Sequence, residues 1–204
     1  MRYIQSSLNE NLLVTKEDSY INFNKFRSGD SNICFVTGIS GSGKSVLSRK
    51  LAVEYNAILY SLDDFDFFCP DFKGYSTIYK NDSMFRNFIN KNKDFKFFLD
   101  SNFVKNMSKD IIKNFFIRFI PFIIEWCTSQ KTFKFIIEGI QIFIFSNPKE
   151  LRKYPIIIKN SSVKKSLQQK KERDSYNAAD IAKDLPWEVT QDILLSRFRR
   201  AVGG

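Results

Sequence analysis

The sequence contains no histidine and only three cysteines, Cys34, Cys69 and Cys127, in its 204 residues. The cysteines are widely spaced and form no CxxC pair, so together with the lack of histidine they argue against a zinc site. An odd number of cysteines, and the absence of an apolar signal-peptide core after Met1, favour a reducing, intracellular compartment. We therefore expect a cytoplasmic protein.

Long apolar runs and blocks of like charge are missing as well. The most apolar stretch, residues 111–126, is too short to cross a bilayer and contains Lys113, Asn114 and Arg118, which is typical of a buried helix. The formal net charge is +10, yet the basic residues are scattered, with no block of five or six and no arginine-rich arm. The charge favours a phosphate-bearing ligand, and nucleic acid is a possible partner that it does not favour. Nothing in the sequence indicates a membrane partner or an oligomeric state.

Short apolar runs alternate with segments of helical periodicity. Residues 20–23 alternate as an edge strand would, before a turn at residues 27–30. Buried strands are predicted at residues 33–37, 57–60, 133–137 and 154–158. Three apolar stripes with helical spacing each predict a helix. They are Leu47, Leu51 and Tyr55; then Met107, Ile111, Phe115, Phe119 and Ile123, with a kink near Pro121; and finally Trp187, Ile193, Leu194 and Phe198. A fourth helix is predicted for the basic segment at residues 161–173.

This alternation predicts an α/β fold of three layers, in which a parallel sheet of four or five strands is flanked by helices. There is no internal repeat and no long linker. We expect one domain at residues 31–204 and an N-terminal extension at residues 1–30 that packs on it.

Residues 38–45 read Gly-Ile-Ser-Gly-Ser-Gly-Lys-Ser, the spacing of a P-loop, between a predicted strand and a predicted helix. Glycines in such a loop allow backbone conformations and close approaches that a Cβ would obstruct. Amides at the helix N-terminus then face the phosphates, the lysine neutralises the β- and γ-phosphates, and the serine hydroxyl binds Mg²⁺. The alternative is an ordinary Gly/Ser loop that binds no ligand. The residues predicted to bind ATP or GTP are Gly38, Ser40, Gly41, Ser42, Gly43, Lys44 and Ser45.

Two acidic segments follow predicted strands, and parallel strands place such segments at one edge of the sheet. Asp63 and Asp64 follow the second predicted strand, where a carboxylate can accept the proton of a substrate hydroxyl. The alternative is an acidic turn or a helix N-cap. Glu138 and Gly139 come directly after the strand predicted at residues 133–137. Glu138 can hold Mg²⁺ together with Ser45, or it can simply end the strand at a turn.

The helix predicted at residues 161–173 is strongly basic. A lid that closes over a triphosphate uses one or two cations to stabilise the transferred charge. Arg173 is the strongest candidate because its planar guanidinium suits phosphate oxygens. The alternative is an ordinary solvated helix face. The other cations are Lys164, Lys165, Lys170 and Lys171.

Residues 38–45, 63–68 and 135–143 together resemble the small P-loop kinases of the uridine kinase and nicotinamide riboside kinase kind. The resemblance implies that Asp63 activates the acceptor hydroxyl, that Glu138 lies near the metal and that residues 164–173 occupy the place of the lid. It does not extend to the first 30 residues or to the middle of the chain, where those kinases recognise their acceptor.

The sequence thus predicts a MgATP- or MgGTP-dependent enzyme that transfers the γ-phosphate to a hydroxyl of a small, nucleoside-like or otherwise hydroxylated metabolite. Its catalytic residues are expected to be Lys44, Asp63, Asp64, Glu138 and Arg173. Two alternatives stay open. One is a kinase of a polynucleotide 5′-hydroxyl or a toxin-like kinase of a larger substrate, which agrees with the +10 charge. The other is a regulatory NTPase with no acceptor except water.

Overall fold

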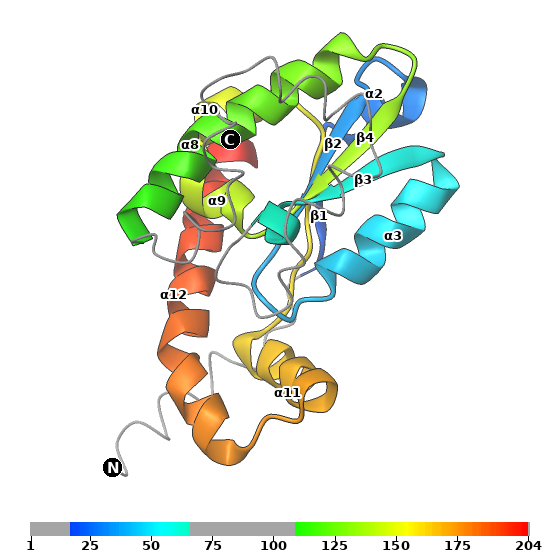
Figure 1. The fold of residues 1–204 in the computed structure, drawn as a ribbon. Coiled ribbons are helices and arrows are strands. Elements are labelled where there is room, and N and C mark those ends of the chain that lie inside the picture. The colour runs from blue at the N-terminus through cyan, green and yellow to red at the C-terminus, as the bar shows by residue number, and fades with distance from the viewer. Residues whose placement is uncertain (1–16, 66–108, 204) are drawn as a thin grey trace.

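The structure, a computed structural model shown in Figure 1, describes residues 17–65 and 109–203. Predicted features at positions 1–16, 66–108 and 204 lie outside these ranges, among them residues 66–68 of the acidic segment, Cys69 and Met107. The elements in chain order are β1 (Ser19–Ile21), α2 (Phe23–Ser28), β2 (Ile33–Thr37), α3 (Lys44–Glu54), β3 (Ala57–Ser61), the 3₁₀ helix η1 (Leu62–Phe65), α8 (Lys109–Ser129), β4 (Lys134–Glu138), α9 (Gln141–Phe145), α10 (Pro148–Leu151), β5 (Ile156–Ile158), α11 (Val163–Asp174) and α12 (Ala178–Gly203).

The strands form one sheet in the order β1-β5-β2-β4-β3. Strands β2, β3, β4 and β5 are parallel, and β1 pairs antiparallel with β5, with Tyr20 opposite Ile157. The prediction of an α/β fold with a sheet of four or five strands flanked by helices is therefore confirmed, with the difference that one edge strand is antiparallel.

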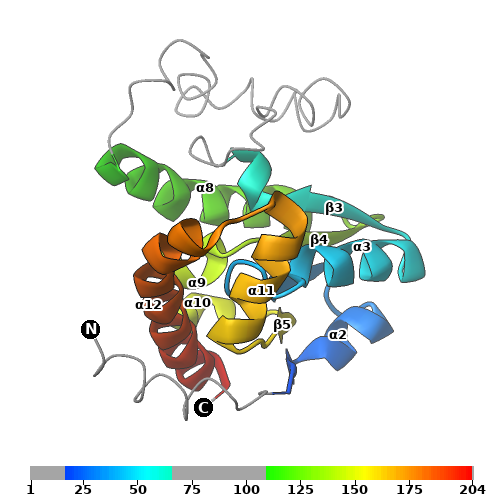
Figure 2. The same ribbon diagram turned by 90° about the horizontal axis from the view of Figure 1, so that it is seen from below.

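Helices cover both faces of the sheet, as the view in Figure 2 shows. Alternate side chains of β2 enter two separate cores: Ile33 and Phe35 pack under α8, α9 and α12, whereas Cys34 and Val36 pack under α2 and α3. All four side chains are fully buried or nearly so. A strand that is buried on both faces reads as a continuous apolar run, which explains why β2 was recognisable from the sequence.

The N-terminal part of the described chain differs from its prediction. The edge strand is present but ends at Ile21, and Phe23 begins the short helix α2. Residues 27 and 28, predicted as part of a turn, belong to that helix, which ends at Gly29 with a left-handed φ of 91°. The helix forms here because Phe26 is fully buried against the sheet, a tertiary contact that the local sequence does not reveal.

Helix α8 contains the predicted apolar stripe from Ile111 onward, although Ile111 itself is exposed. Phe115, Phe119 and Ile123 are buried, and Pro121 lies inside the helix. The stretch is thus part of a helix that packs on the sheet, as predicted. Within residues 17–65 and 109–203, no helix combines the length and the apolar character that a membrane crossing requires.

Helix α12 buries only part of the predicted apolar stripe: Phe198 is buried and Leu194 packs against the core. Trp187 and Ile193 are about half exposed, at 47% and 49%. Two of the buried positions are polar, so a search for an apolar stripe cannot find this face. Its buried residues are Glu188, Gln191, Leu195, Phe198 and Val202.

Candidate functional site

The four parallel strands end at one edge of the sheet, and each delivers a polar segment there. The loop at residues 38–45 follows β2, and residues 61–63 end β3 and begin η1. Glu138 is the last residue of β4, and Lys159 follows β5. Helix α11 lies across this edge in Figures 1 and 2, with α12 beside it. Segments far apart in the sequence therefore meet where parallel α/β sheets bind ligands.

The glycines of the loop are required by its shape. Gly41 and Gly43 have left-handed φ values of 75° and 85°, which side chains other than glycine adopt at a cost. A Cβ on Gly38 would lie 2.5 Å from the carbonyl oxygen of Lys159, and one on Gly41 would lie 2.5 Å from that of Ser166. The loop is thus enclosed by the segment after β5 and by α11.

The loop leads directly into the N-terminus of helix α3. Helix α3 begins at Lys44, and its N-cap residue, Gly43, provides no side chain to cap the first turn. The first amides of a helix have no partner within the helix. Together with the helix dipole they form a site that favours an anion.

A side chain of α12 holds the beginning of the loop. The Gln191 Oε1 atom accepts a hydrogen bond of 2.7 Å from the amide of Ser40, and Gln191 is fully buried. The amide of Ser42 donates to the carbonyl of Ile39 at 3.1 Å, which closes a turn within the loop. The amides of Ser40 and Ser42 are therefore already bonded within the protein, one to α12 and one to the loop itself.

Ser45 and Glu138, the two predicted metal ligands, are in contact. The Ser45 hydroxyl donates a hydrogen bond of 3.1 Å to Glu138 Oε1, and the Ser61 hydroxyl donates one of 3.0 Å to the same oxygen. Glu138 is only 2% exposed. Its other oxygen, Oε2, is buried and accepts no hydrogen bond within the described ranges.

Burial is the main influence on the charge of Glu138. Loss of solvent raises the pKa of its carboxyl group, and the nearby Asp63 carboxylate raises it further. The Lys44 ammonium and the hydroxyls of Ser61 and Ser45 act in the opposite direction and lower the pKa. Lys44 itself is 6% exposed. The site therefore contains a buried acid, with one unsatisfied oxygen, next to a buried cation.

Asp63 is positioned by Gln141, which lies where the chain passes from β4 into α9. Gln141 Nε2, at the start of α9, donates a hydrogen bond of 3.0 Å to Asp63 Oδ1. A Cβ on Gly139 would lie 2.4 Å from Gln141 Oε1 and 2.8 Å from the Cβ of Leu62, so glycine at this position allows η1 and α9 to approach. Asp64 follows in η1, and its side chain lies outside the described part of the structure.

Helix α11 places Lys170, rather than Arg173, against the loop. The Lys170 Cγ atom would lie 3.2 Å from a Cβ on Gly41. The ammonium of Lys170 bonds with the Glu188 carboxylate and lies 3.4 Å from that of Asp184, both in α12. Arg173 is on the exposed side of α11. The structure thus joins the predicted lid helix to α12 through a buried lysine.

Several residues around this edge were not predicted from the sequence. Gln141 and Gln191 contact Asp63 and the loop, and Glu188 pairs with the lid helix. A polar residue inside an apolar run, as in the segment Glu-Gly-Ile-Gln-Ile-Phe, is a signal that could have identified Gln141. Gln191 and Glu188 carry no comparable signal, because their helix is rich in charged residues.

The chemistry of the donors limits the kind of metal that the site suits. Within the described ranges, no group of three or more histidine, cysteine, aspartate or glutamate side chains is arranged to hold a metal ion. One carboxylate and one serine hydroxyl, completed by water and phosphate oxygens, suit Mg²⁺, which binds through few protein ligands. The unsatisfied Glu138 Oε2 fits such an ion.

Comparison of the chain with protein-family models, with curated proteins and with solved structures finds no match. The interpretation of the site therefore depends on its residues and their geometry.

Proposed function

We propose that this protein is a P-loop phosphotransferase that moves the γ-phosphate of a nucleoside triphosphate to a hydroxyl group of a small molecule. The observation that supports this most is the convergence of three features at one edge of the sheet. They are the glycine-rich loop that leads into α3, the Ser45–Glu138 contact, and Asp63, held by Gln141. The sequence resemblance to small P-loop kinases supports the same reading.

In this proposal the loop binds the phosphates. Amides in the first turn of α3 and the Lys44 ammonium stabilise the negative charge of the β- and γ-phosphates. Lys44 is buried beside Glu138, so its charge acts where water screens it weakly. Ser45 and Glu138 would hold Mg²⁺, which supplies charge neutralisation for the phosphate oxygens when it is bound.

Asp63 is the proposed general base. It lies at the same edge as Glu138 and close enough to raise the pKa of that carboxyl group. Its Oδ1 atom accepts the hydrogen bond from Gln141, which fixes the orientation of the carboxylate. The carboxylate would accept the proton of the acceptor hydroxyl as that oxygen attacks phosphorus. Helix α11 would supply cationic charge above the loop, with Lys170 and Arg173 as its candidates.

The test is a phosphate-transfer screen. Purified protein is incubated with Mg²⁺ and with ATP or GTP labelled at the γ-phosphate, against pooled nucleosides, other hydroxylated metabolites, and 5′-hydroxyl RNA and DNA oligonucleotides. We expect label to move to a small-molecule pool, and the Lys44→Ala protein, treated in parallel, to transfer none.

Other outcomes of the screen would contradict the proposal. Label on the oligonucleotides alone would identify a polynucleotide kinase. Release of free phosphate that no pool changes would identify an NTPase without an acceptor. Equal transfer by wild type and Lys44→Ala would show that the activity does not belong to this loop.

A further inference from the structure

A polar pocket of about 430 Å³ lies at the carboxyl edge of the sheet, on the β5 side of the loop. The segment that enters β1 forms one wall, with Glu17, Asp18 and Tyr20. Residues 159–161, after β5, form another, and Lys165 of α11 completes the lining. Strand β1 belongs to the N-terminal extension, for which the sequence suggested no role in the site.

Lys159 lines this pocket and also contacts the loop. The Lys159 amide donates a hydrogen bond of 2.7 Å to the carbonyl of Thr37, the last residue before the loop. Its carbonyl oxygen lies against Gly38, and its Cε atom would lie 3.9 Å from a Cβ on Gly43. The pocket and the loop are therefore neighbours that share Lys159.

The sheet order sets the direction in which a bound triphosphate would extend. Glu138 ends β4 and Asp63 follows β3, on one side of β2, whereas the pocket lies after β5 and before the antiparallel β1, on the other side. A triphosphate whose γ-phosphate faces Glu138 and Asp63 directs its opposite, esterified end away from β4. The nucleoside is attached at that end, so it leaves the loop toward β5.

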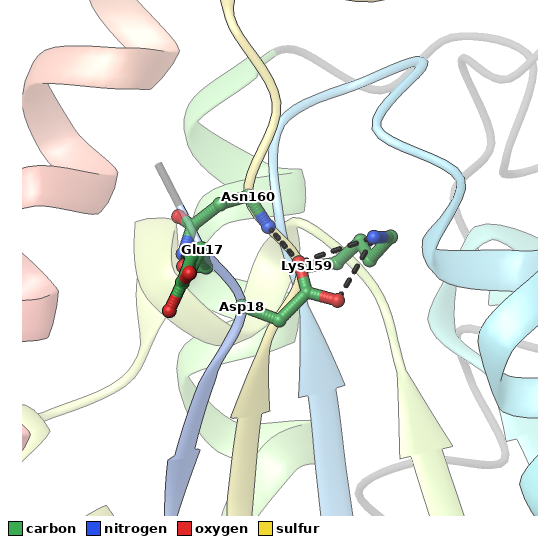
Figure 3. Close-up of polar contacts among 4 residues, drawn as sticks. All are labelled: Glu17, Asp18, Lys159 and Asn160. Carbon is green, nitrogen blue, oxygen red and sulfur yellow. Dashed lines mark hydrogen bonds and ion pairs between the residues drawn. The ribbon is translucent and has the colours of Figure 1, made fainter. Parts of the chain in front are cut away.

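Hydrogen-bonding groups and an exposed ring line the pocket. Asp18 Oδ1 accepts a hydrogen bond of 2.9 Å from the amide of Asn160, and the Lys159 ammonium lies 2.8 Å from Asp18 Oδ2 (Figure 3). The Asn160 side chain donates to the carbonyl of Glu17. Tyr20 is 54% exposed. A carboxylate and an amide oxygen can accept from amino or hydroxyl groups, and an exposed aromatic ring can stack on a heterocycle.

We propose that this pocket binds the nucleoside of the triphosphate donor and that Asp18 and Tyr20 of the N-terminal extension determine how tightly it is held. The proposal rests on the proposed function, since it requires a triphosphate on the loop. Asp18 accepts hydrogen bonds from the base or ribose, and the Tyr20 ring stacks on the base. The ion pair with Lys159 and the bond from Asn160 hold Asp18 in place for this task.

The test compares ligands with and without a nucleoside. Dissociation constants are measured by calorimetry, in the presence of Mg²⁺, for ATP, GTP and inorganic tripolyphosphate, with wild type, Tyr20→Ser and Asp18→Asn. We expect each variant to bind the preferred nucleotide more weakly, on the order of tenfold, because a stacking contact or a hydrogen bond to a charged group is lost. Affinity for tripolyphosphate should stay unchanged, or rise in Asp18→Asn because a negative charge is removed.

The matched control is Asp30→Asn, which makes the same chemical change at an exposed position in the segment between α2 and β2. It should leave all three dissociation constants unchanged. Asp18→Asn also removes an ion pair that holds β1, so Tyr20→Ser, at a half-exposed ring that contacts Phe23, provides a second variant, and circular dichroism shows that each variant is folded. Equal loss of nucleotide and tripolyphosphate affinity, or no loss of nucleotide affinity in either variant, would overturn the pocket assignment. Failure of the wild type to bind any of the three ligands would instead overturn the proposed function.

Discussion

Ser45, in the first turn of α3, donates a hydrogen bond of 3.1 Å to Oε1 of Glu138, the last residue of β4. The two residues are 93 positions apart in the chain, and they meet because β2 and β4 are neighbouring parallel strands. Their contact joins the glycine-rich loop to an acid that is almost completely buried.

We expect Glu138→Gln to stabilise the nucleotide-free protein at neutral pH. Burial raises the pKa of Glu138 in the folded state above its ordinary value. The stability that this group contributes is therefore fully present below the ordinary pKa of glutamate and is lost as the pH rises through the raised, folded-state pKa. The amide cannot ionise, so its advantage should appear and grow as the pH rises.

Urea unfolding at pH 5 and pH 8 measures this difference. The free energy of unfolding of Glu138→Gln should exceed that of wild type by more at pH 8 than at pH 5. A variant that is less stable than wild type at pH 8 would show that the Glu138 carboxylate is well compensated in the folded protein.

Asp63→Asn should separate nucleotide binding from phosphate transfer. The asparagine Oδ1 atom can still accept the hydrogen bond from Gln141, so the side chain keeps its orientation. It cannot accept a proton, and loss of a general base costs about 10²–10⁴-fold in rate. Transfer of labelled phosphate should fall within that range while the dissociation constant of the nucleotide stays nearly constant. Normal transfer by this variant would remove Asp63 from the mechanism.

Gly41→Ala should destabilise the protein more than Gly29→Ala. Both glycines have left-handed φ values, so both variants incur the conformational cost of about 1–2 kcal/mol. The added Cβ meets nothing within 4 Å at Gly29, but it lies 2.5 Å from the Ser166 carbonyl oxygen at Gly41. Urea unfolding of the two variants isolates the cost of displacing α11. Equal losses would mean that α11 moves away from the loop freely.

Removing one partner of the Lys170–Glu188 pair should lower the free energy of unfolding strongly, whereas replacing both by apolar residues should lower it little. Both residues are buried, so Lys170→Met leaves the Glu188 charge without its partner, a loss of about 3–5 kcal/mol in the free energy of unfolding. The double variant Lys170→Met, Glu188→Leu should recover most of that loss, because it removes both buried charges. As a control, Lys183→Met, whose pair with Asp180 is exposed, should cost about 1 kcal/mol or less. Failure of the double variant to recover would mean that the pair itself stabilises α11 on α12.

The strands of this fold could be predicted from the sequence, whereas the buried faces of some helices could not. Strands such as β2 are buried on both sides, so their apolar runs were visible in the sequence. The buried face of α12 contains Glu188 and Gln191, whose burial is made possible by Lys170 and the Ser40 amide, partners that lie far away in the chain. Helix α2 was missed for the same reason, since the contacts of Phe26 with the sheet determine it.

The candidate site follows the same division. Local motifs identified Lys44, Ser45 and Glu138, because their residue types follow predicted strands or begin a helix. The residues that hold the site together, Gln141 and Gln191, act through single long-range hydrogen bonds that no local spacing encodes.

Equilibrium binding of nucleoside triphosphates tests the central claim most directly. ATP and GTP are titrated, with Mg²⁺, into wild type and into Lys44→Ala, with circular dichroism to show that both proteins are folded. We predict saturable binding of at least one nucleotide to wild type and a loss of at least about tenfold in affinity in Lys44→Ala, since a buried, charge-assisted contact with the phosphates is removed. Absence of binding to folded wild type, or equal affinity of the two proteins, would contradict the account.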